Sequence, residues 1–338
     1  MTDKPLVSVV VPVYNVKDYL PQCLDSLLAI NYPSKEIILV EDCSSDGSLD
    51  ICLSYKEQYP SLILIQHKQN KGLQEARITG VNNANGEYVM FVDSDDFVDT
   101  DILNYLVSNV IQFKADMACV SFYWFSKGAK SEDRRSIYGV FHRKEIETLF
   151  QRNLIMDDDL YRAGLPMYLW GKLFKTDAIK ESLQKGHDLR YGEDEVSVVD
   201  YLMNYTQTLV SIGIPLYNYR QHPLQITSKT IIELWSDYIL LWERLETLDT
   251  WSWDMVLPKR MWCFLKPSIY GKSTYKNMGN FIYAMRQLRN AMIVKKYIYD
   301  NNHLSSNIKK HPHYFLLKYR LYLIDYIMYK IIWSLHKK

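Results

Sequence analysis

Short runs of apolar residues alternate with segments of helical periodicity through the first 120 residues. Five of these runs are rich in β-branched and aromatic side chains, which is typical of strands buried on both faces of a sheet. We predict strands at residues 6–13, 37–40, 62–66, 88–92 and 117–122. Because helical segments separate them, the predicted fold class is α/β, with a mostly parallel sheet sandwiched by helices.

The segments between these runs carry apolar residues at the spacing of one helix face. Residues 20–28 show such a pattern, which Pro33 ends, so we predict a helix after the first strand. Asp46 or Ser48 can cap the next helix, because both side chains accept hydrogen bonds from unpaired backbone amides. The same spacing returns at residues 103–110.

The pattern changes towards the carboxyl end of the chain. Beyond about residue 139 it is mixed, and beyond about Ser228 it is helical and aromatic, without clear strands. We therefore expect a domain at residues 1–228, with an acceptor half at about 121–228, and a helical extension at residues 229–338.

Charge and composition narrow the class of protein. The 338 residues include 40 Lys and Arg and 39 Asp and Glu, with 48% hydrophobic and 14% aromatic residues. This excludes a disordered or collagen-like chain and argues against nucleic acid as a partner. The charges are unevenly distributed along the chain, because residues 229–338 carry 18 basic and 8 acidic side chains. The two parts are expected to present different surfaces.

The cysteines point to a reducing compartment. There are five, an odd number, and no CxxC motif occurs among them. We expect a cytoplasmic protein and no secretory leader over residues 1–13.

Three polar segments follow predicted strands, where ligands bind in parallel sheets. They are Tyr14-Asn15, Glu41–Gly47 and Asp93–Asp96. The three carboxylates of the last segment repel one another, and Mg²⁺ or Mn²⁺ held with substrate phosphates would offset them. A solvated acidic turn is the alternative, and Glu41–Gly47 alone is typical of a turn and helix cap.

Taken together, these segments resemble the family 2 glycosyltransferases, which have the Rossmann-like GT-A fold. The resemblance covers about residues 5–110. It rests on Pro12–Asn15, Glu41–Ser48, Asn70–Gly72 with Ala76-Arg77, and Gly86–Tyr88 leading into Asp93–Asp96.

The resemblance implies a site for a nucleotide sugar, within a nucleotide-binding half at about residues 1–120. Pro12 and Tyr14 would flank the base, and Asp42 would bond it. Gly72 and Arg77 would complete the nucleotide pocket. Glu41 departs from the family, in which aspartate is commoner, but it keeps the charge.

The acidic segment would hold the reacting part of the donor. By the same resemblance, Asp93 lies near the ribose or the donor sugar. Asp95 is the ligand of a divalent cation, Mn²⁺ or Mg²⁺, that bridges the diphosphate. Asp96 would bond the donor sugar or the acceptor.

A second acidic centre lies at residues 190–195. The Glu-Asp pair of the family matches Glu193-Asp194, and its base matches Asp194, which would take the proton from an acceptor hydroxyl. A base used in this way gives inversion at the anomeric carbon. Alone, the segment would more simply cap the following helix.

Two further stretches match the family. Trp170 and Lys172 resemble the segment that lines the acceptor side, to which Glu193 would also belong. Arg220 resembles the residue that closes over the diphosphate, and His222 is a further candidate metal ligand. Gln225 stands where the family often has serine.

The tail allows two interpretations. Residues 255–338 carry 16 basic and two acidic side chains. Four charges interrupt the apolar segment at residues 314–333, and each would cost ~2.5–3.5 kcal/mol at mid-bilayer, so we do not expect a spanning helix. An interfacial helix at the inner face of the cell membrane and a contact with the catalytic domain or with a second copy both remain open.

The predicted function is therefore transfer of one sugar, with inversion, from a nucleotide sugar to a hydroxyl group. The resemblance implies a UDP-sugar as donor and a glycan, lipid-linked or protein-linked acceptor of the kind found in bacterial surface polysaccharides and protein glycans. A nucleotidyltransferase and a non-catalytic, nucleotide-sugar-binding assembly subunit of the same fold are the alternatives.

Overall fold

The computed structural model describes residues 4–133, 137–153, 167–222, 234–248 and 278–300, and isolated positions between 257 and 327. The chain forms two compact units, one of residues 1–149 with 163–222 and one of the remaining residues. The boundary predicted near Ser228 lies outside the described residues, as do Gln225 and most of the segment 314–333.

The first unit is built on one ten-stranded sheet whose leading half is parallel. Its main path runs β3-β2-β1-β4-β9-β6-β10-β5. The parallel half consists of β1 (Val7–Val13), β2 (Lys35–Glu41), β3 (Ile63–Gln66) and β4 (Tyr88–Phe91). The first four predicted strands are therefore confirmed, with ends that differ by one or two residues.

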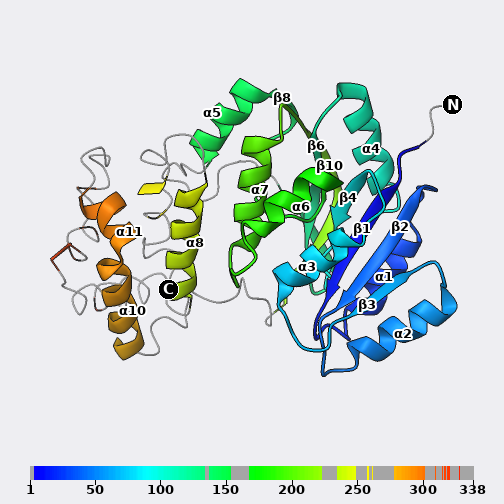
Figure 1. Ribbon diagram of the computed structural model, residues 1–338, viewed down its shortest axis with the longest axis horizontal. Helices are drawn as coiled ribbons and strands as arrows, with labels where there is room; N and C mark the ends of the chain where they lie inside the picture. The colour runs from blue at the N-terminus through cyan, green and yellow to red at the C-terminus, as the bar shows by residue number, and fades with distance from the viewer. Residues whose placement is uncertain are drawn as a thin grey trace. The chain divides into compact units, whose positions relative to one another are not determined.

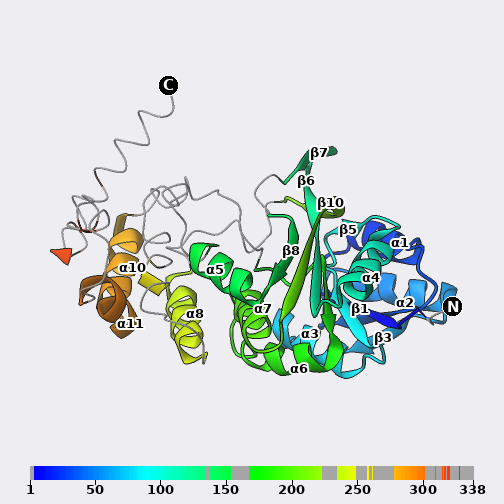
Figure 2. The same ribbon diagram turned by 90° about the horizontal axis from the view of Figure 1, so that it is seen from above.

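Helices cover both faces of this sheet, as predicted (Figures 1 and 2). One apolar core lies between the sheet and α1 (Leu20–Leu28), α2 (Ser48–Gln58) and α4 (Ile102–Phe113). A second core lies between the other face and α3 (Leu73–Asn82), α5 (Arg143–Asn153), α6 (Thr176–Gln184) and α7 (Glu193–Asn204). The two cores fix the strands, so the loops at their carboxyl ends start from a rigid base.

The other half of the sheet mixes parallel and antiparallel pairing. The fifth predicted strand is β6 (Met117–Ser126), which runs four residues further than expected. Short strand β9 (Lys172–Lys175) lies antiparallel between β4 and β6, while β10 (Thr208–Arg220) is parallel to β6. The antiparallel strands β5 (Phe97–Val98), β7 (Ala129–Glu132) and β8 (Gly139–His142) complete the sheet. This arrangement brings the end of β10 beside the segment that follows β4.

The described part of the second unit is mostly helical. Its helices are α8 (Trp235–Thr247), α10 (Met278–Asn290) and α11 (Met292–Val294), followed by a π-helical turn at Lys295–Tyr299. Trp242 and Phe281 are completely buried within it. In the described part of the chain, no helix combines the length and the apolar character needed to cross a membrane.

Candidate functional site

The loops that follow β1 and β2 are joined by hydrogen bonds from backbone amides to side chains. Asp46 Oδ2 accepts from Lys17 N at 3.0 Å, and Ser48 Oγ accepts from Val16 N at 2.9 Å. Tyr14, at the end of β1, is 48% exposed, whereas Pro12 is buried. The Tyr14 ring is therefore available to stack on a planar ligand, as expected for a nucleobase.

Asp42 lies at the end of β2 and is almost fully buried. Its carboxylate accepts hydrogen bonds from Lys71 N and Gly72 N, both at 2.8 Å, and lies 2.7 Å from His67 Nδ1. Gly72 has a φ of +94°, which favours glycine, and is the N-cap of α3. Asp42 thus shapes the loop that leads into α3.

The acidic segment after β4 is held by the end of β10. The Tyr217 hydroxyl accepts from Asp93 N at 3.2 Å and donates to Asp96 Oδ2 at 2.8 Å. Arg220 N donates to Asp96 Oδ1 at 2.7 Å. Burial, and then the charges of Asp95 and Asp93, raise the pKa of Asp96 well above its usual range. Additional positive charge at this segment would therefore be stabilising.

Asp95 faces two nitrogen-bearing side chains from the end of β10. Its Oδ2 lies 2.8 Å from His222 Nε2, and its backbone carbonyl accepts from Arg220 Nε at 2.6 Å. The Arg220 guanidinium also donates to Gln22 Oε1 and lies 5.0 Å from the centroid of the Tyr19 ring. The structure thus brings together the predicted metal ligands and the arginine predicted to bind the diphosphate.

The donor set of this cluster fits a cation that is bound together with substrate. Among the described residues, no three His, Cys, Asp or Glu side chains are grouped as metal ligands. Mg²⁺ and Mn²⁺ commonly use one or two carboxylates and complete their shell with substrate phosphates and water. Asp95, with His222 beside it, satisfies that requirement.

Arg77 connects the acidic segment to the start of α7. Its Nη2 donates to Asp93 Oδ1 and its Nη1 donates to Glu193 Oε1, both at 2.9 Å. The side chain is 2% exposed. The two predicted acidic centres are therefore next to each other, although about 100 residues separate them in the sequence.

Asp194 occupies the first turn of α7, after the N-cap Gly192. Gly192 has a φ of +77°, and Asp194 Oδ1 accepts from Glu195 N at 2.7 Å. Burial among protein atoms, followed by the charge of Glu193, raises the pKa of Asp194 to about 7. A carboxylate whose pKa lies near neutral pH is suited to take a proton in a reaction.

An aromatic cluster lies beside this acidic site. The Trp170 ring stacks on Tyr168, with centroids 3.5 Å apart, and on Tyr217, with centroids 4.3 Å apart. Lys172 lies on the sheet face that α7 covers. It is completely buried, and its Nζ has no hydrogen-bond partner in the described part of the chain. An amine left in this state is suited to bind an oxygen atom of a ligand.

Burial controls the protonation of Lys172. It lowers the pKa of the Lys172 amine to about 7, against the opposing charges of Cys119 and Asp194. The Tyr168 ring centroid, 3.8 Å from Nζ, favours the ammonium form. A cation–π contact contributes only ~0.5–2 kcal/mol, whereas burying an ion costs several kcal/mol, so the direction of the pKa change holds.

We expect Lys172→Met to raise the free energy of unfolding at pH 7 by about 1–3 kcal/mol. Above pH 7 the folded chain releases the Lys172 proton while the unfolded chain keeps it, so wild-type stability rises until the unfolded lysine also titrates. The gain from the substitution should therefore shrink between about pH 7 and about pH 10. Urea unfolding at several pH values measures this. Lys175→Met, which changes a half-exposed lysine of the same strand, is the control and should bring no gain.

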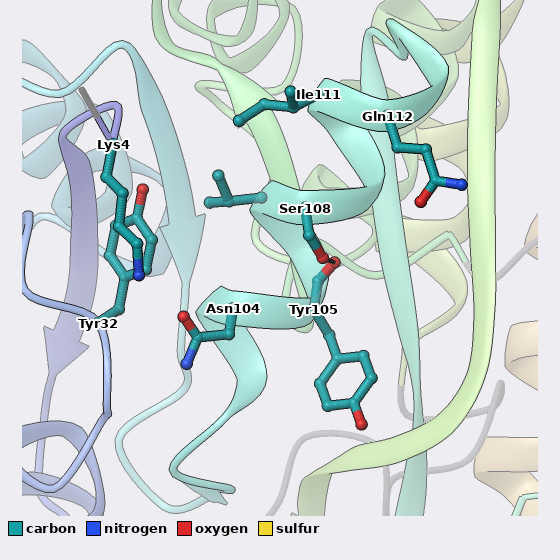
Figure 3. Close-up of a pocket in the computed structure, with 8 residues that line it drawn as sticks. Lys4, Tyr32, Asn104, Tyr105, Ser108, Ile111 and Gln112 are labelled. Atoms are coloured by element: carbon teal, nitrogen blue, oxygen red, sulfur yellow. Dashed lines mark hydrogen bonds between the residues drawn. The ribbon is translucent and has the colours of Figure 1, made fainter. Parts of the chain in front are cut away.

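A separate cavity of about 590 Å³ lies away from these residues (Figure 3). It is lined by Lys4, Tyr32 and α4 residues that include Tyr105 and Ile111. Lys4 and Tyr32 precede β1 and β2, so the cavity is at the amino ends of the strands. The acidic site is at their carboxyl ends, so the cavity does not contribute to it.

The structure adds residues that the sequence did not single out. His67 contacts Asp42, Tyr217 holds the acidic segment, and Tyr19 and Gln22 contact Arg220. The sequence could have indicated His67, because it directly follows β3. The parallel strands β2 and β3 end at the same edge of the sheet, which brings His67 close to Asp42. Nothing local in the sequence identifies the contacts of Tyr19 and Gln22.

Comparison with known proteins identifies relatives for the first unit. Residues 8–167 match the family model described as Glycosyl transferase family 2. Glycosyltransferase GlyA of Streptococcus pneumoniae serotype 4 is 29% identical over 231 residues, which cover 68% of this chain and 32% of that protein. The uncharacterized glycosyltransferase EpsJ of Bacillus subtilis is 30% identical, over 66% of this chain and 63% of its own length. The chain thus matches about a third of the first relative and under two thirds of the second.

A solved structure has the same fold. S. aureus TarS (residues 1–349) in complex with UDP-GlcNAc aligns with a TM-score of 0.66 at 16% identity, over 93% of this chain and 88% of that chain. At this level of identity the likeness concerns the fold, and it confirms the predicted GT-A architecture.

Proposed function

Because residues 8–167 match the model of glycosyl transferase family 2, we propose that the chain is a member of that family and that it transfers one sugar, with inversion, from a UDP-sugar to an acceptor hydroxyl. The observation that carries the proposal is the Arg77 bridge. It unites the acidic segment of Asp93 with the first turn of α7, where Asp194 lies. Binding of UDP-GlcNAc by TarS, which shares the fold, supports the choice of donor.

The residues divide into a donor side and an acceptor side. Tyr14 stacks on the base, while Asp42 contacts it and shapes the Gly72 loop. Arg220 binds the diphosphate. Asp93 lies near the ribose or the donor sugar. Asp96 is buried and accepts from the Tyr217 hydroxyl and from Arg220 N, so it supports the acidic segment from behind. On the acceptor side, Trp170, Lys172 and Glu193 line the approach of the acceptor.

The proposed reaction is a direct displacement. The acceptor oxygen attacks the anomeric carbon as its proton passes to Asp194, and the bond from that carbon to the diphosphate breaks, which releases UDP. Arg220 stabilises the charge that grows on the departing diphosphate. Asp95, with His222, would hold a divalent cation, which supplies further neutralisation of that charge when it is bound.

The proposal also covers the class of acceptor and the location of the protein. We propose a glycan, lipid-linked or protein-linked acceptor. We also propose a cytoplasmic protein whose residues 255–338 contact the inner face of the membrane or a second copy of the chain. Pelleting the chain with anionic vesicles, with and without residues 305–338, tests the membrane contact, and equal pelleting would contradict it.

A panel of UDP-sugars tests the proposed activity. The full chain is incubated with each donor, UDP-GlcNAc included, in Mn²⁺ or Mg²⁺, and UDP release is measured. We expect release from at least one donor and its loss in EDTA. Release of a sugar 1-phosphate, as the uridylyl group passes to another molecule, would indicate a nucleotidyltransferase, and UDP binding without release from any donor would indicate a binding subunit.

A further inference from the structure

Arg77 is a charged side chain in an almost fully buried position. It is 2% exposed, and each of its terminal nitrogens donates to a carboxylate at 2.9 Å. A buried charge is tolerated only when it is paired and hydrogen-bonded. Asp93 and Glu193 provide that pairing, so the guanidinium is fixed in one orientation.

The two carboxylates belong to different sides of the site. Asp93 begins the acidic segment that contains Asp95, and Glu193 is the first residue of α7, next to Asp194. A guanidinium is a rigid, planar fork. Arg77 therefore fixes the spacing between the acidic segment and the start of α7.

Among the described residues, four charged side chains lie close enough to Asp194 to interact with its charge. Glu193 and Glu195 come from its own helix, Arg77 from α3 and Lys172 from β9. After burial, Glu193 raises the pKa of Asp194 and Arg77 lowers it. Loss of the Arg77 charge would favour the protonated form of Asp194, which cannot accept a proton.

We propose that Arg77 is a positioning residue, which holds the base Asp194 at a fixed place relative to the donor. This inference rests on the proposed function, because it takes Asp194 as the base. It goes beyond the expectation that Arg77 completes the nucleotide pocket, because Nη1 and Nη2 each donate to a protein carboxylate. The other donors of the guanidinium include Nε, which has no hydrogen-bond partner among the described residues.

Three variants test the proposal through kcat, its pH profile and UDP affinity. Arg77→Gln should lower kcat by about 10–100-fold, as misplacement of a reacting group does. It should also move the acid limb of the profile up by about one pH unit, with UDP affinity unchanged. Arg77→Lys keeps the positive charge but lacks the two terminal nitrogens of the planar guanidinium. It should therefore lower kcat without shifting the acid limb of the pH profile. Glu193→Gln should move the limb to lower pH, and it remains informative if Arg77→Gln fails to fold.

Arg143→Gln is the matched control, because Arg143 holds the other end of α7. Its Nη1 donates to Leu202 O at 3.0 Å and to Thr206 O at 3.2 Å. This variant should leave the acid limb in place. The same movement in Arg143→Gln would show that any loosening of α7 suffices, and would overturn the proposal.

A carboxyl NMR titration separates this proposal from the proposed function. The Asp194 signal is identified by its loss in Asp194→Asn and is followed in wild type, Arg77→Gln and Glu193→Gln. An Asp194 titration that is the same in all three overturns the inference, whether or not turnover is seen. UDP affinity reduced more than about tenfold in Arg77→Gln, with the limb unmoved, would make Arg77 a nucleotide ligand. Failure of the wild type to release UDP from any donor counts against the proposed function instead.

Discussion

Replacing Asp194 by asparagine is expected to lower kcat for sugar transfer by about 10²–10⁴-fold, the usual contribution of general base catalysis. Asparagine keeps the size of the side chain and can still accept from Glu195 N, but it cannot take the acceptor proton. UDP affinity should stay unchanged. In the wild type, kcat should fall below about pH 7, because the pKa of Asp194 is about 7 and only the ionised form is a base.

The control for this prediction is Asp177→Asn. Asp177 is also in the first turn of a helix, but its side chain is fully exposed. Its substitution should change neither kcat nor the pH profile. Activity of Asp194→Asn close to that of the wild type would exclude Asp194 as the base.

The second large effect is expected at Asp95. Asp95→Ala should lower turnover by at least about 10²–10³-fold, as loss of a group that stabilises developing charge does. It should also remove the gain in UDP affinity that Mn²⁺ or Mg²⁺ brings, because the proposed protein carboxylate for the cation is gone. Calorimetric titration with UDP, in the presence of cation and in EDTA, measures the second effect without turnover.

Asp50→Ala is the matched control for Asp95→Ala. Asp50 is an exposed aspartate in the first turn of α2, so its substitution should leave both measurements unchanged. If UDP binding by Asp95→Ala still strengthens when Mn²⁺ is added, Asp95 is not the ligand.

The parallel half of the sheet was predictable because each strand there is a continuous apolar run. Residues of β1 to β4 lie in the two apolar cores or pack against them. Strands buried in this way are rich in apolar residues, so composition alone predicts them. The strands β5 and β9 have two and four residues and gain their pairing from distant partners. No local pattern records such pairing, so these two short strands could not be predicted.

The sequence indicated which segments form the site, but it indicated few of the contacts between their side chains. The sequence indicated that Asp95 and His222 belong together, and the structure brings them within 2.8 Å. The sequence did not indicate that Arg77 joins Asp93 to Glu193. Arg77 and Glu193 are 116 residues apart, and an ion pair over that distance produces no recognisable pattern in the sequence. The roles of these residues in binding and transfer stay predictions until the variants are measured.

The hydrogen bonds that Asp42 makes to Lys71 N and Gly72 N have a consequence for how a donor is captured. A loop that is held by hydrogen bonds within the protein loses little conformational entropy when a ligand binds. Capture should therefore resemble docking to a preformed surface, with an association rate limited by diffusion and orientation and not by loop folding.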